Sequence, residues 1–502
     1  MREIFARPRW NSPIAILLFI AAAKVVLHTL TNSQYGFHRD ELATLDDARH
    51  LAWGYVAYPP VTPFIGRIAL TLFGPSLRGF RFFATVAGGI SVVLTGLITK
   101  ELGGKRLAQV VAAIAVAIAP ISLASSRVFQ YVAFDFLAWV LVAYAVVRVI
   151  NSDDPRWWIG MGAAIGFGML TKYTMIFLVA GIVAGVLLSP MRNQLRNGWV
   201  WCGVGVSLLV FLPNFIWQIQ HHFISIEFLN NIHARDIRIG RTDGFLIKQI
   251  FVGTALFTAP LAIAGLVWLF TSSGKRYRLL AWMFLTPLVL FYFARGRDYY
   301  QAAAYPMLLA AGAVRFETTV SRLMPRAAAW AKGITWVGMA ANALLGILLL
   351  LPVSPVNSAV WSAVGDDFRE EIGWPELVQT VGRIRDSLSM EDRSHFAVLA
   401  GNYGEAGAIN LYGPAYGLHS AISGINSFWA RGYGDPPPQT LIVLGLSRTF
   451  VDRNFETCIV AGQISNRFGV MNEETSRHKD IFLCRHLRQP WPEFWKGFQY
   501  FG

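Results

Sequence analysis

The sequence predicts a polytopic α-helical membrane protein that carries a small α/β domain at its C-terminal end. Of the 502 residues, 54% are hydrophobic and only 15% are charged, whereas soluble proteins have about 25% charged residues. The mean hydropathy is +0.43. Apolar runs long enough to cross a bilayer as helices, about 20 residues each, recur with almost no charge inside them. With 35 Phe, 17 Trp and 3 Cys, disordered, collagen-like and disulfide-scaffold classes are excluded.

The membrane part covers residues 1–355 and divides at charge clusters and turns into eleven apolar segments. Every second loop is basic, and Lys and Arg accumulate in cytoplasmic loops. We therefore expect Met1–Trp10 to be cytoplasmic and everything after Leu351 to lie outside. The accumulation of Lys and Arg in cytoplasmic loops then accounts for the net charge of +14, which therefore indicates no nucleic-acid partner. The predicted spans are residues 12–32, 79–99, 107–124, 130–150, 157–171, 174–189, 198–217, 247–270, 279–294, 299–318 and 333–352.

The loops expected outside also carry cations, which the charge rule for membrane proteins does not predict. Two explanations stay open: these side chains bind lipid headgroups, or they bind an outward-facing anionic ligand, for which phosphate is the natural choice. The residues concerned are His38, Arg39, Arg67, Arg78, Arg81, Arg127, Lys172, Arg235, Arg238, Arg241, Arg295 and Arg297.

From about Pro355 the sequence changes character and predicts an outer α/β domain over residues 356–502. Short β-rich runs, at residues 395–400, 440–446, 457–461 and 480–485, alternate with helical and Gly/Pro-rich stretches. Cys458 and Cys484 both fall on predicted strands, in a compartment that permits disulfides. Either a bridge or two buried thiols fits this pattern.

The first outer loop, residues 33–78, contains the clearest candidate for chemistry. Asp40 and Glu41 follow the first span, and a helix is expected to begin here with Leu42, Leu45 and Ala48 on one face. Such an amphipathic helix is suited to lie along the membrane surface. Asp40 is either the N-cap of this helix or a general base at the boundary between water and lipid.

Two further polar residues interrupt the apolar pattern. Asp135 lies in an otherwise apolar span, where a carboxylate costs about 2.5–3.5 kcal/mol near the middle and usually marks a site or a pair. A hydrated structural carboxylate is the alternative. Lys172, between the fifth and sixth spans, either extends toward lipid headgroups or contacts a ligand.

The segment Asp40-Glu41, with Ala48-Arg49-His50-Leu51, Gly54-Tyr55 and Pro59-Pro60, resembles the first outer loop of family-39-like glycosyltransferases of the GT-C superfold. This group includes protein O-mannosyltransferases, lipid A aminoarabinose transferase and rhizobial galacturonosyltransferases. The resemblance extends to Asp135, to the Leu170-Thr171-Lys172 turn and to Tyr300–Pro306. It implies sugar transfer, with inversion, from a polyprenyl-phosphate donor to a lipid, glycan or protein acceptor at the outer face of a bacterial inner membrane.

The resemblance also implies roles for individual residues. Asp40 becomes the base, with Glu41 and Asp135 as further acidic residues of the site. Lys172 and Tyr300 become contacts to the donor phosphate, which Arg127 and Arg295 would also serve as outer cations. Some relatives bind a divalent ion, for which Asp40 and Asp135 are the candidate ligands. The sequence departs from the family's Tyr-x-x-Pro-x-x-Pro pattern because Ala303 stands where the first proline is expected.

A transporter or flippase for an anionic lipid is the rival prediction, because it would use the same basic outer cavity. Such proteins ordinarily show internal repeats or broken helices at matching positions. The sequence shows no such repeat.

Overall fold

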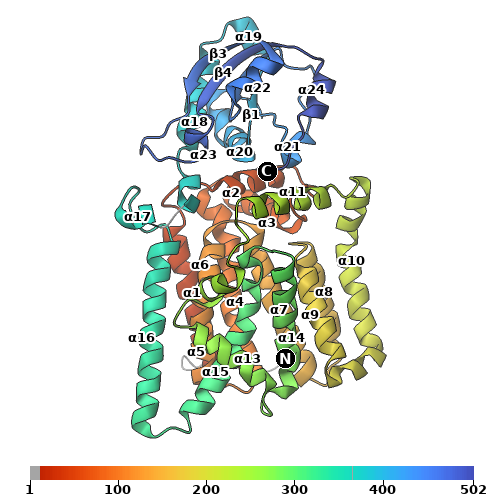
Figure 1. The fold of residues 1–502 in the computed structure, drawn as a ribbon, viewed down its shortest axis with the longest axis vertical. Helices are drawn as coiled ribbons and strands as arrows, with labels where there is room; N and C mark the ends of the chain where they lie inside the picture. Colours follow the sequence, from red (N-terminus) through yellow and green to blue (C-terminus); the bar gives the residue numbers. More distant parts are fainter. Residues whose placement is uncertain (1–11, 364–365) are drawn as a thin grey trace.

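The computed structural model describes residues 12–363 and 366–502, so the segment Met1–Trp10 lies outside the described residues. A helical bundle forms the lower part of the molecule, and a small mixed domain is stacked on one end of it (Figure 1). The protein is thus a multi-pass helical membrane protein with a separate C-terminal layer, as the composition predicts.

Each of the eleven predicted apolar segments folds as helix. Five helices in the described ranges are long and apolar enough to cross a membrane alone, or up to eight spans result if each of three bent pairs counts as one. Since α8, α14 and α15 have only 13, 16 and 16 residues, eleven spans remain a prediction. The bundle helices are α1 (Pro13–Thr31), α4 (Leu77–Glu101), α5 (Arg106–Ala117), α6 (Pro120–Arg127), α7 (Tyr131–Asn151), α8 (Trp157–Met169), α9 (Met175–Leu187), α10 (Gly198–Gln220), α12 (Phe245–Gln249), α13 (Ala259–Phe270), α14 (Arg278–Phe293), α15 (Tyr305–Val320) and α16 (Pro325–Leu350).

At the break between α5 and α6, a lysine side chain satisfies a backbone carbonyl group that the helix leaves free. The two helices meet at 54°, because Pro120 cannot continue the hydrogen bonds of α5. Carbonyl groups left free inside an apolar bundle must be satisfied by other groups of the protein. Lys24 of α1 does this for Ala117 at the end of α5, since its Nζ donates to that carbonyl oxygen (3.4 Å), and Nζ also donates to the carbonyl oxygen of Ser122 within α6 (3.0 Å).

Three helices lie across the end of the bundle beneath the C-terminal domain: α2 (Arg39–Arg49), α3 (Val61–Phe73) and α11 (Ile224–Arg238) (Figure 1). The predicted helix at Asp40 is confirmed, and Leu42, Leu45 and Ala48 are fully buried on it. Their partner differs from the expectation, however. This apolar face packs against protein rather than lipid, because Gly407 of the C-terminal domain comes within contact distance of Leu42.

The C-terminal domain contains all four predicted strands: β1 (Phe396–Ala400), β2 (Thr440–Leu444), β3 (Phe455–Gln463) and β4 (Asp480–Leu487). Their order is β1-β2-β4-β3. The β1–β2 pair is parallel and the other two pairs are antiparallel. The accompanying helices are α17 (Ala359–Ala363), α18 (Trp374–Asp386), α19 (Met390–Ser394), α20 (Tyr403–Tyr412), α21 (Asn426–Trp429), α22 (Arg448–Asn454), α23 (Glu473–Ser476) and α24 (Trp491–Gly497).

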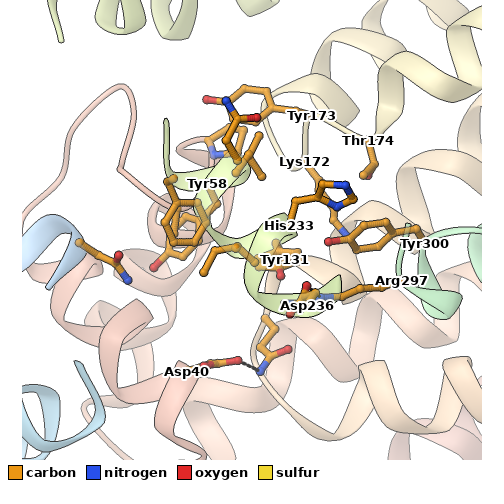
Figure 2. Close-up of a pocket in the computed structure, with 18 of the residues that line it drawn as sticks. Asp40, Tyr58, Tyr131, Lys172, Tyr173, Thr174, His233, Asp236, Arg297 and Tyr300 are labelled. Carbon is orange, nitrogen blue, oxygen red and sulfur yellow. Dashed lines mark hydrogen bonds and ion pairs between the residues drawn. The ribbon is translucent and has the colours of Figure 1, made fainter. Parts of the chain in front are cut away.

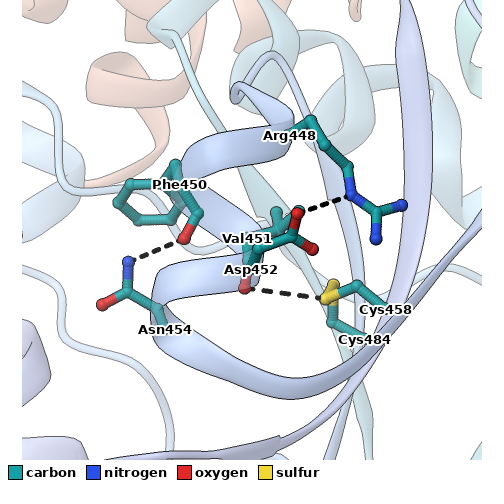
Figure 3. The surroundings of a disulfide bond; sticks show 7 residues. All are labelled: Arg448, Phe450, Val451, Asp452, Asn454, Cys458 and Cys484. Atoms are coloured by element: carbon teal, nitrogen blue, oxygen red, sulfur yellow. Dashed lines mark hydrogen bonds and ion pairs between the residues drawn. A yellow bond between two sulfur atoms is a disulfide. The ribbon is translucent and has the colours of Figure 1, made fainter.

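A disulfide joins the edge strand β3 to its antiparallel neighbour β4. Cys458 of β3 and Cys484 of β4 stand directly opposite one another, with Cα atoms 4.2 Å apart, and are bridged beside α22 (Figure 3). The structure therefore has the bridge rather than two buried thiols. Cys202 on α10 is free and exposed.

Candidate active site

A cavity of about 570 Å³ lies where the bundle meets the C-terminal domain. Its walls come from α2, the turn after α8, α11, the segment around the 3-10 turn η4 (Asp298–Tyr300), and the C-terminal domain. Figure 2 shows the charged and aromatic side chains that face one another across it. The polar lining includes Asp40, Thr44, Asp47, Tyr58, Gln130, Lys172, His233, Asp236, Arg295, Arg297 and Tyr403.

The helix α2 presents one polar face to this cavity. Asp40, Ala43, Thr44 and Asp47 all line it, at the spacing that places residues on the same side of a helix. The N-cap of α2 is His38, whose side chain accepts the Asp40 backbone N–H, while Glu41 accepts the His38 N–H. The N-cap alternative for Asp40 is therefore wrong, and its carboxylate is free to face the cavity.

Two donors hold the Asp40 carboxylate. Gln130 Nε2 donates to Oδ2 at 2.9 Å, and the Tyr403 hydroxyl donates to Oδ1 at 2.8 Å. The side chain is 44% exposed, so a substrate in the cavity can reach it. A carboxylate has about four lone-pair sites, and the remaining ones are available to accept a proton.

Glu41, expected in the same site, points into the core instead. It is fully buried and bonds the Arg81 guanidinium through both oxygens, at 2.8 and 2.5 Å, and also accepts the Phe129 N–H. Burial alone would raise the pKa of this carboxyl, but Arg81 and the backbone donors hold the pKa below its usual value. Glu41 thus anchors α2 and does not line the cavity.

Arg127 is also placed away from the cavity lining. Its guanidinium pairs with Glu371 at 2.5 Å and lies over the Phe368 ring at 4.4 Å. Glu371 already balances the charge of Arg127, and Arg127 does not line the cavity, so its contact to a donor phosphate stays a prediction. The same Glu371 also lies 3.4 Å from Arg81.

Lys172 lies in the cavity wall with an aromatic surround. Its ammonium is 4.0 Å from the ring centroid of Tyr300, 4.7 Å from that of Tyr299 and 4.9 Å from that of Tyr131. The side chain is buried, and Nζ has no hydrogen-bond partner within the described part of the chain. It therefore does not extend to lipid headgroups, and both Lys172 and Tyr300 line the cavity.

Asp135 follows Tyr131 by one turn of α7 and is buried. It does not line the cavity, and it interacts electrostatically with Lys172. Asp40 and Asp135 therefore do not face a common space, and the residues do not fit a metal ion held between them. Across residues 12–363 and 366–502, no group of three or more His, Cys, Asp or Glu side chains is arranged to hold a metal ion.

The remaining cations of the cavity come from α11 and the segment after α14. Arg295 lines the cavity, is exposed, and has no ion-pair partner among the described residues. Arg297 pairs with the buried Asp236 at 2.5 Å, and Arg241 lies 3.9 Å from the same carboxylate. Sequence reasoning counted these arginines as outer cations but missed Asp236, Gln130 and Tyr403, which only the tertiary fold brings to the cavity.

Part of the chain is similar to one protein family model and to curated glycosyltransferases. Residues 57–217 match the family model of dolichyl-phosphate-mannose-protein mannosyltransferase. The lipid A galacturonosyltransferase RgtD of Rhizobium johnstonii is 24% identical over 47% of this chain and 49% of its own length. The undecaprenyl phosphate-α-4-amino-4-deoxy-L-arabinose arabinosyl transferase 1 of Pseudomonas fluorescens is 25% identical over 51% of this chain and 48% of its own length. The chain thus spans about half the length of the curated relatives that it matches.

Solved structures extend the likeness to the whole fold. ArnT from Cupriavidus metallidurans, bound to undecaprenyl phosphate, superposes with a TM-score of 0.62 and 13% identity, over 93% of this chain and 97% of ArnT. The Archaeoglobus fulgidus oligosaccharyltransferase gives a TM-score of 0.55 at 12% identity, over 86% of this chain and 68% of that one. The chain therefore has the fold of ArnT, and part of its sequence is similar to the mannosyltransferase family model and to curated glycosyltransferases, as the resemblance of its first outer loop predicts.

Proposed function

We propose that the protein transfers a sugar from a polyprenyl-phosphate carrier to an acceptor hydroxyl, with Asp40 as the general base. The observation that carries the proposal is the cavity itself. It places a buried lysine, whose Nζ makes no hydrogen bond within the described residues, on one wall, and a held but accessible carboxylate on another. The relatives named above act on polyprenyl-linked or lipid substrates, which supports this assignment.

Lys172 and Arg295 are suited to bind the carrier phosphate. Buried lysines are rare unless they are paired. Asp135 interacts with Lys172 electrostatically, and a phosphate would supply the hydrogen bond that Nζ lacks within the described residues. Tyr300 stacks beneath the ammonium and fixes its direction. When the bond between the anomeric carbon and the phosphate oxygen breaks, the electron pair stays on the phosphate. The added negative charge then lies beside the cations that already face it.

Asp40 would serve the other half of the reaction. The acceptor hydroxyl oxygen attacks the anomeric carbon from the side opposite the phosphate, which inverts the configuration. Its proton passes to the Asp40 carboxylate, so the bonds and charges balance without a metal ion. Asp135, which interacts electrostatically with Lys172, tunes the phosphate-binding cation rather than taking the proton.

The cavity also offers a path for the isoprenoid chain. Ile176, Phe177 and Phe291 line it at the ends of α9 and α14. Ile176 is 57% exposed. These apolar side chains would contact the isoprenoid units next to the phosphate, while the cations of the cavity would bind the phosphate itself.

We place the cavity and the C-terminal domain on the outer face of a bacterial inner membrane. The Cys458–Cys484 bridge supports this side, because disulfides persist in oxidising compartments. The alternating basic loops favour the same side. A reporter fused after Gly502 should be active only outside the cytoplasm, and one fused after Arg278 only inside. Activity of both fusions on one side would contradict this topology.

Purified protein incubated with a panel of polyprenyl-phosphate sugars tests the activity, with mass spectrometry detecting the released carrier phosphate. Asp40→Asn should fold normally and transfer sugar at least ~100-fold more slowly, because an amide cannot accept the proton. Asp153→Asn is the matched control, because Asp153 lies on an exposed loop and its side chain makes no hydrogen bond within the described residues. Normal turnover of Asp40→Asn would place the base elsewhere. Movement of intact carrier lipid across a proteoliposome, without sugar release, would indicate a transporter instead.

A further inference from the structure

The C-terminal domain supplies one of the two hydrogen bonds to Asp40. Tyr403, the first residue of α20, donates its hydroxyl to Oδ1, and Gln130 at the N-cap of α7 donates to Oδ2. The carboxylate is therefore held from the domain on one side and from the bundle on the other. Neither donor is adjacent to the Asp40-Glu41 pair in sequence.

Local structure fixes the position of Tyr403. The helix α20 begins with a capping box in which the Asn402 side chain accepts the Glu405 N–H, while Glu405 accepts the Asn402 N–H. The ring of Tyr403 is half-buried and lies 5.0 Å from the guanidinium carbon of Arg39, the neighbour of Asp40. The contact of Tyr403 with Arg39 and Asp40 therefore joins the first turn of α20 to the first turn of α2.

Two glycines allow these helices to approach closely. A Cβ atom at Gly407 would lie 2.7 Å from the Leu42 backbone, and one at Gly404 would lie 3.0 Å from the Arg39 Cβ. Any larger residue at Gly407 would push α20 away from α2. The close approach is what brings the Tyr403 hydroxyl within hydrogen-bond distance of Asp40.

The same domain also forms part of the cavity wall. Asn426, Ser427 and Phe428 line the cavity together with Tyr403. Beside them Arg431 pairs with Asp47, the second carboxylate on the cavity face of α2, at 2.5 Å. The domain thus contacts that face at both of its acidic residues.

We propose that Tyr403 is a positioning residue for Asp40, by which the C-terminal domain completes the active site. The proposal rests on the function proposed above. Two donors at separate oxygens fix the plane of a carboxylate, which leaves its remaining lone pairs directed to the cavity. Without the hydroxyl of Tyr403, one oxygen is released and the carboxylate can rotate about its side-chain bonds. Orientation of this kind controls the rate of the chemical step more than substrate binding.

The test compares the wild-type chain, Tyr403→Phe and Tyr412→Phe in the full-length protein. Tyr403→Phe removes one oxygen and retains the ring that packs beneath Arg39. Tyr412 stands at the other end of α20, and its hydroxyl makes no hydrogen bond within the described residues, so Tyr412→Phe is the matched control. Thermal unfolding of all three shows that each variant is folded.

Two readouts distinguish positioning from a structural role. In Tyr403→Phe we expect kcat to fall by about 10- to 100-fold, with the KM for the donor little changed. The acid limb of the pH–rate profile should also move to higher pH, because a hydrogen bond to the charged form of a carboxylate has been lost. Tyr412→Phe should match the wild type in both. Unchanged kcat and pH profile in Tyr403→Phe would overturn the proposal.

An infrared measurement separates this proposal from the activity itself. The difference spectrum between the wild type and Asp40→Asn identifies the carboxylate bands of Asp40, which should shift in Tyr403→Phe and not in Tyr412→Phe. Unshifted bands overturn the proposal whatever the transfer assay gives. Shifted bands without any transfer by the wild type overturn the proposed function, and the hydrogen bond between the domain and Asp40 stands.

Discussion

The buried ion pair between Arg127 and Glu371 allows a quantitative test of how the bundle and the C-terminal domain are joined. The pair measures 2.5 Å, and its side chains are 6% and 0% exposed. Glu371 lies 3.4 Å from Arg81 as well, and Arg81 also pairs with Glu41 at 2.5 Å. Four buried charges therefore form one ion-pair network, in the order Arg127, Glu371, Arg81 and Glu41, with Arg127 at one end.

The expected magnitudes follow from this arrangement. Removing one partner of a buried pair costs about 3–5 kcal/mol, because it leaves the other charge uncompensated, whereas removing both is often close to neutral. Glu371→Gln leaves Arg127 with only the Phe368 ring, so we expect the upper part of that range. Arg127→Met leaves Glu371 with Arg81, so we expect the lower part. The double variant should lose at least about 2 kcal/mol less than the sum of the two single losses.

The measurement is a double-mutant cycle on the full-length protein in detergent, with denaturant unfolding followed by tryptophan fluorescence. Polyprenyl-phosphate binding is measured on the same four proteins. Since Arg127 does not line the cavity, the folded double variant should bind the carrier phosphate as the wild type does. Additive stability losses would refute the ion pair. Equal loss of carrier affinity in Arg127→Met and in the double variant would restore the phosphate contact that the family resemblance implies.

Two further predictions concern the cavity and the C-terminal domain. Lys172→Met should weaken polyprenyl-phosphate binding by about 10- to 100-fold, as expected for the loss of a hydrogen bond to a charged group. Lys100→Met, at the far end of α4, is the control and should bind the carrier as the wild type does. Equal affinity of the two variants would place the phosphate elsewhere. Burial, followed by the nearby Glu474, raises the pKa of Glu405 to about 8. Between the unfolded value near 4.5 and about 8, the folded chain holds a proton that the unfolded chain releases, so this group's contribution to stability falls as pH rises. In Glu405→Gln the amide oxygen can still accept the Gly401 and Asn402 N–H groups, so Tm relative to the wild type should increase from pH 5 to pH 8; a constant difference would contradict the assignment.

The elements of the fold were predictable because each depends on local pattern. Apolar runs form helices and β-rich runs form the four strands, because the hydrophobic pattern within each segment is enough to indicate its secondary structure. The number of membrane spans was harder to predict, because bends such as the one at Pro120 and short helices such as α8 depend on neighbouring helices. The partner of the apolar face of α2 was not predictable either. Its hydrophobic pattern suits lipid and protein equally, and only the packing of Gly407 decides between them.

The site was predictable only as far as single residues. Asp40 and Lys172 both line the cavity, but the donors to Asp40 lie 90 and 363 residues away in sequence. Glu41 follows Asp40 directly, and neighbours on a helix with 3.6 residues per turn point about 100° apart. One acid therefore faces the cavity while the other meets Arg81 in the core. Arg127 looked available to a phosphate because its partner Glu371 is 244 residues distant.

The placement of α2 has a consequence for how the two substrates are handled. The cations that face the cavity, such as Lys172 and Arg295, belong to the bundle, where under the proposed function a carrier lipid would arrive from the membrane. The C-terminal domain supplies Tyr403 and Arg431 to the acidic face of α2, beside Gln130 from the bundle. A change confined to the domain should therefore alter the base and the acceptor side while leaving carrier binding intact. Changes at Lys172 should do the reverse, so the two sets of variants divide the reaction between the two parts of the chain.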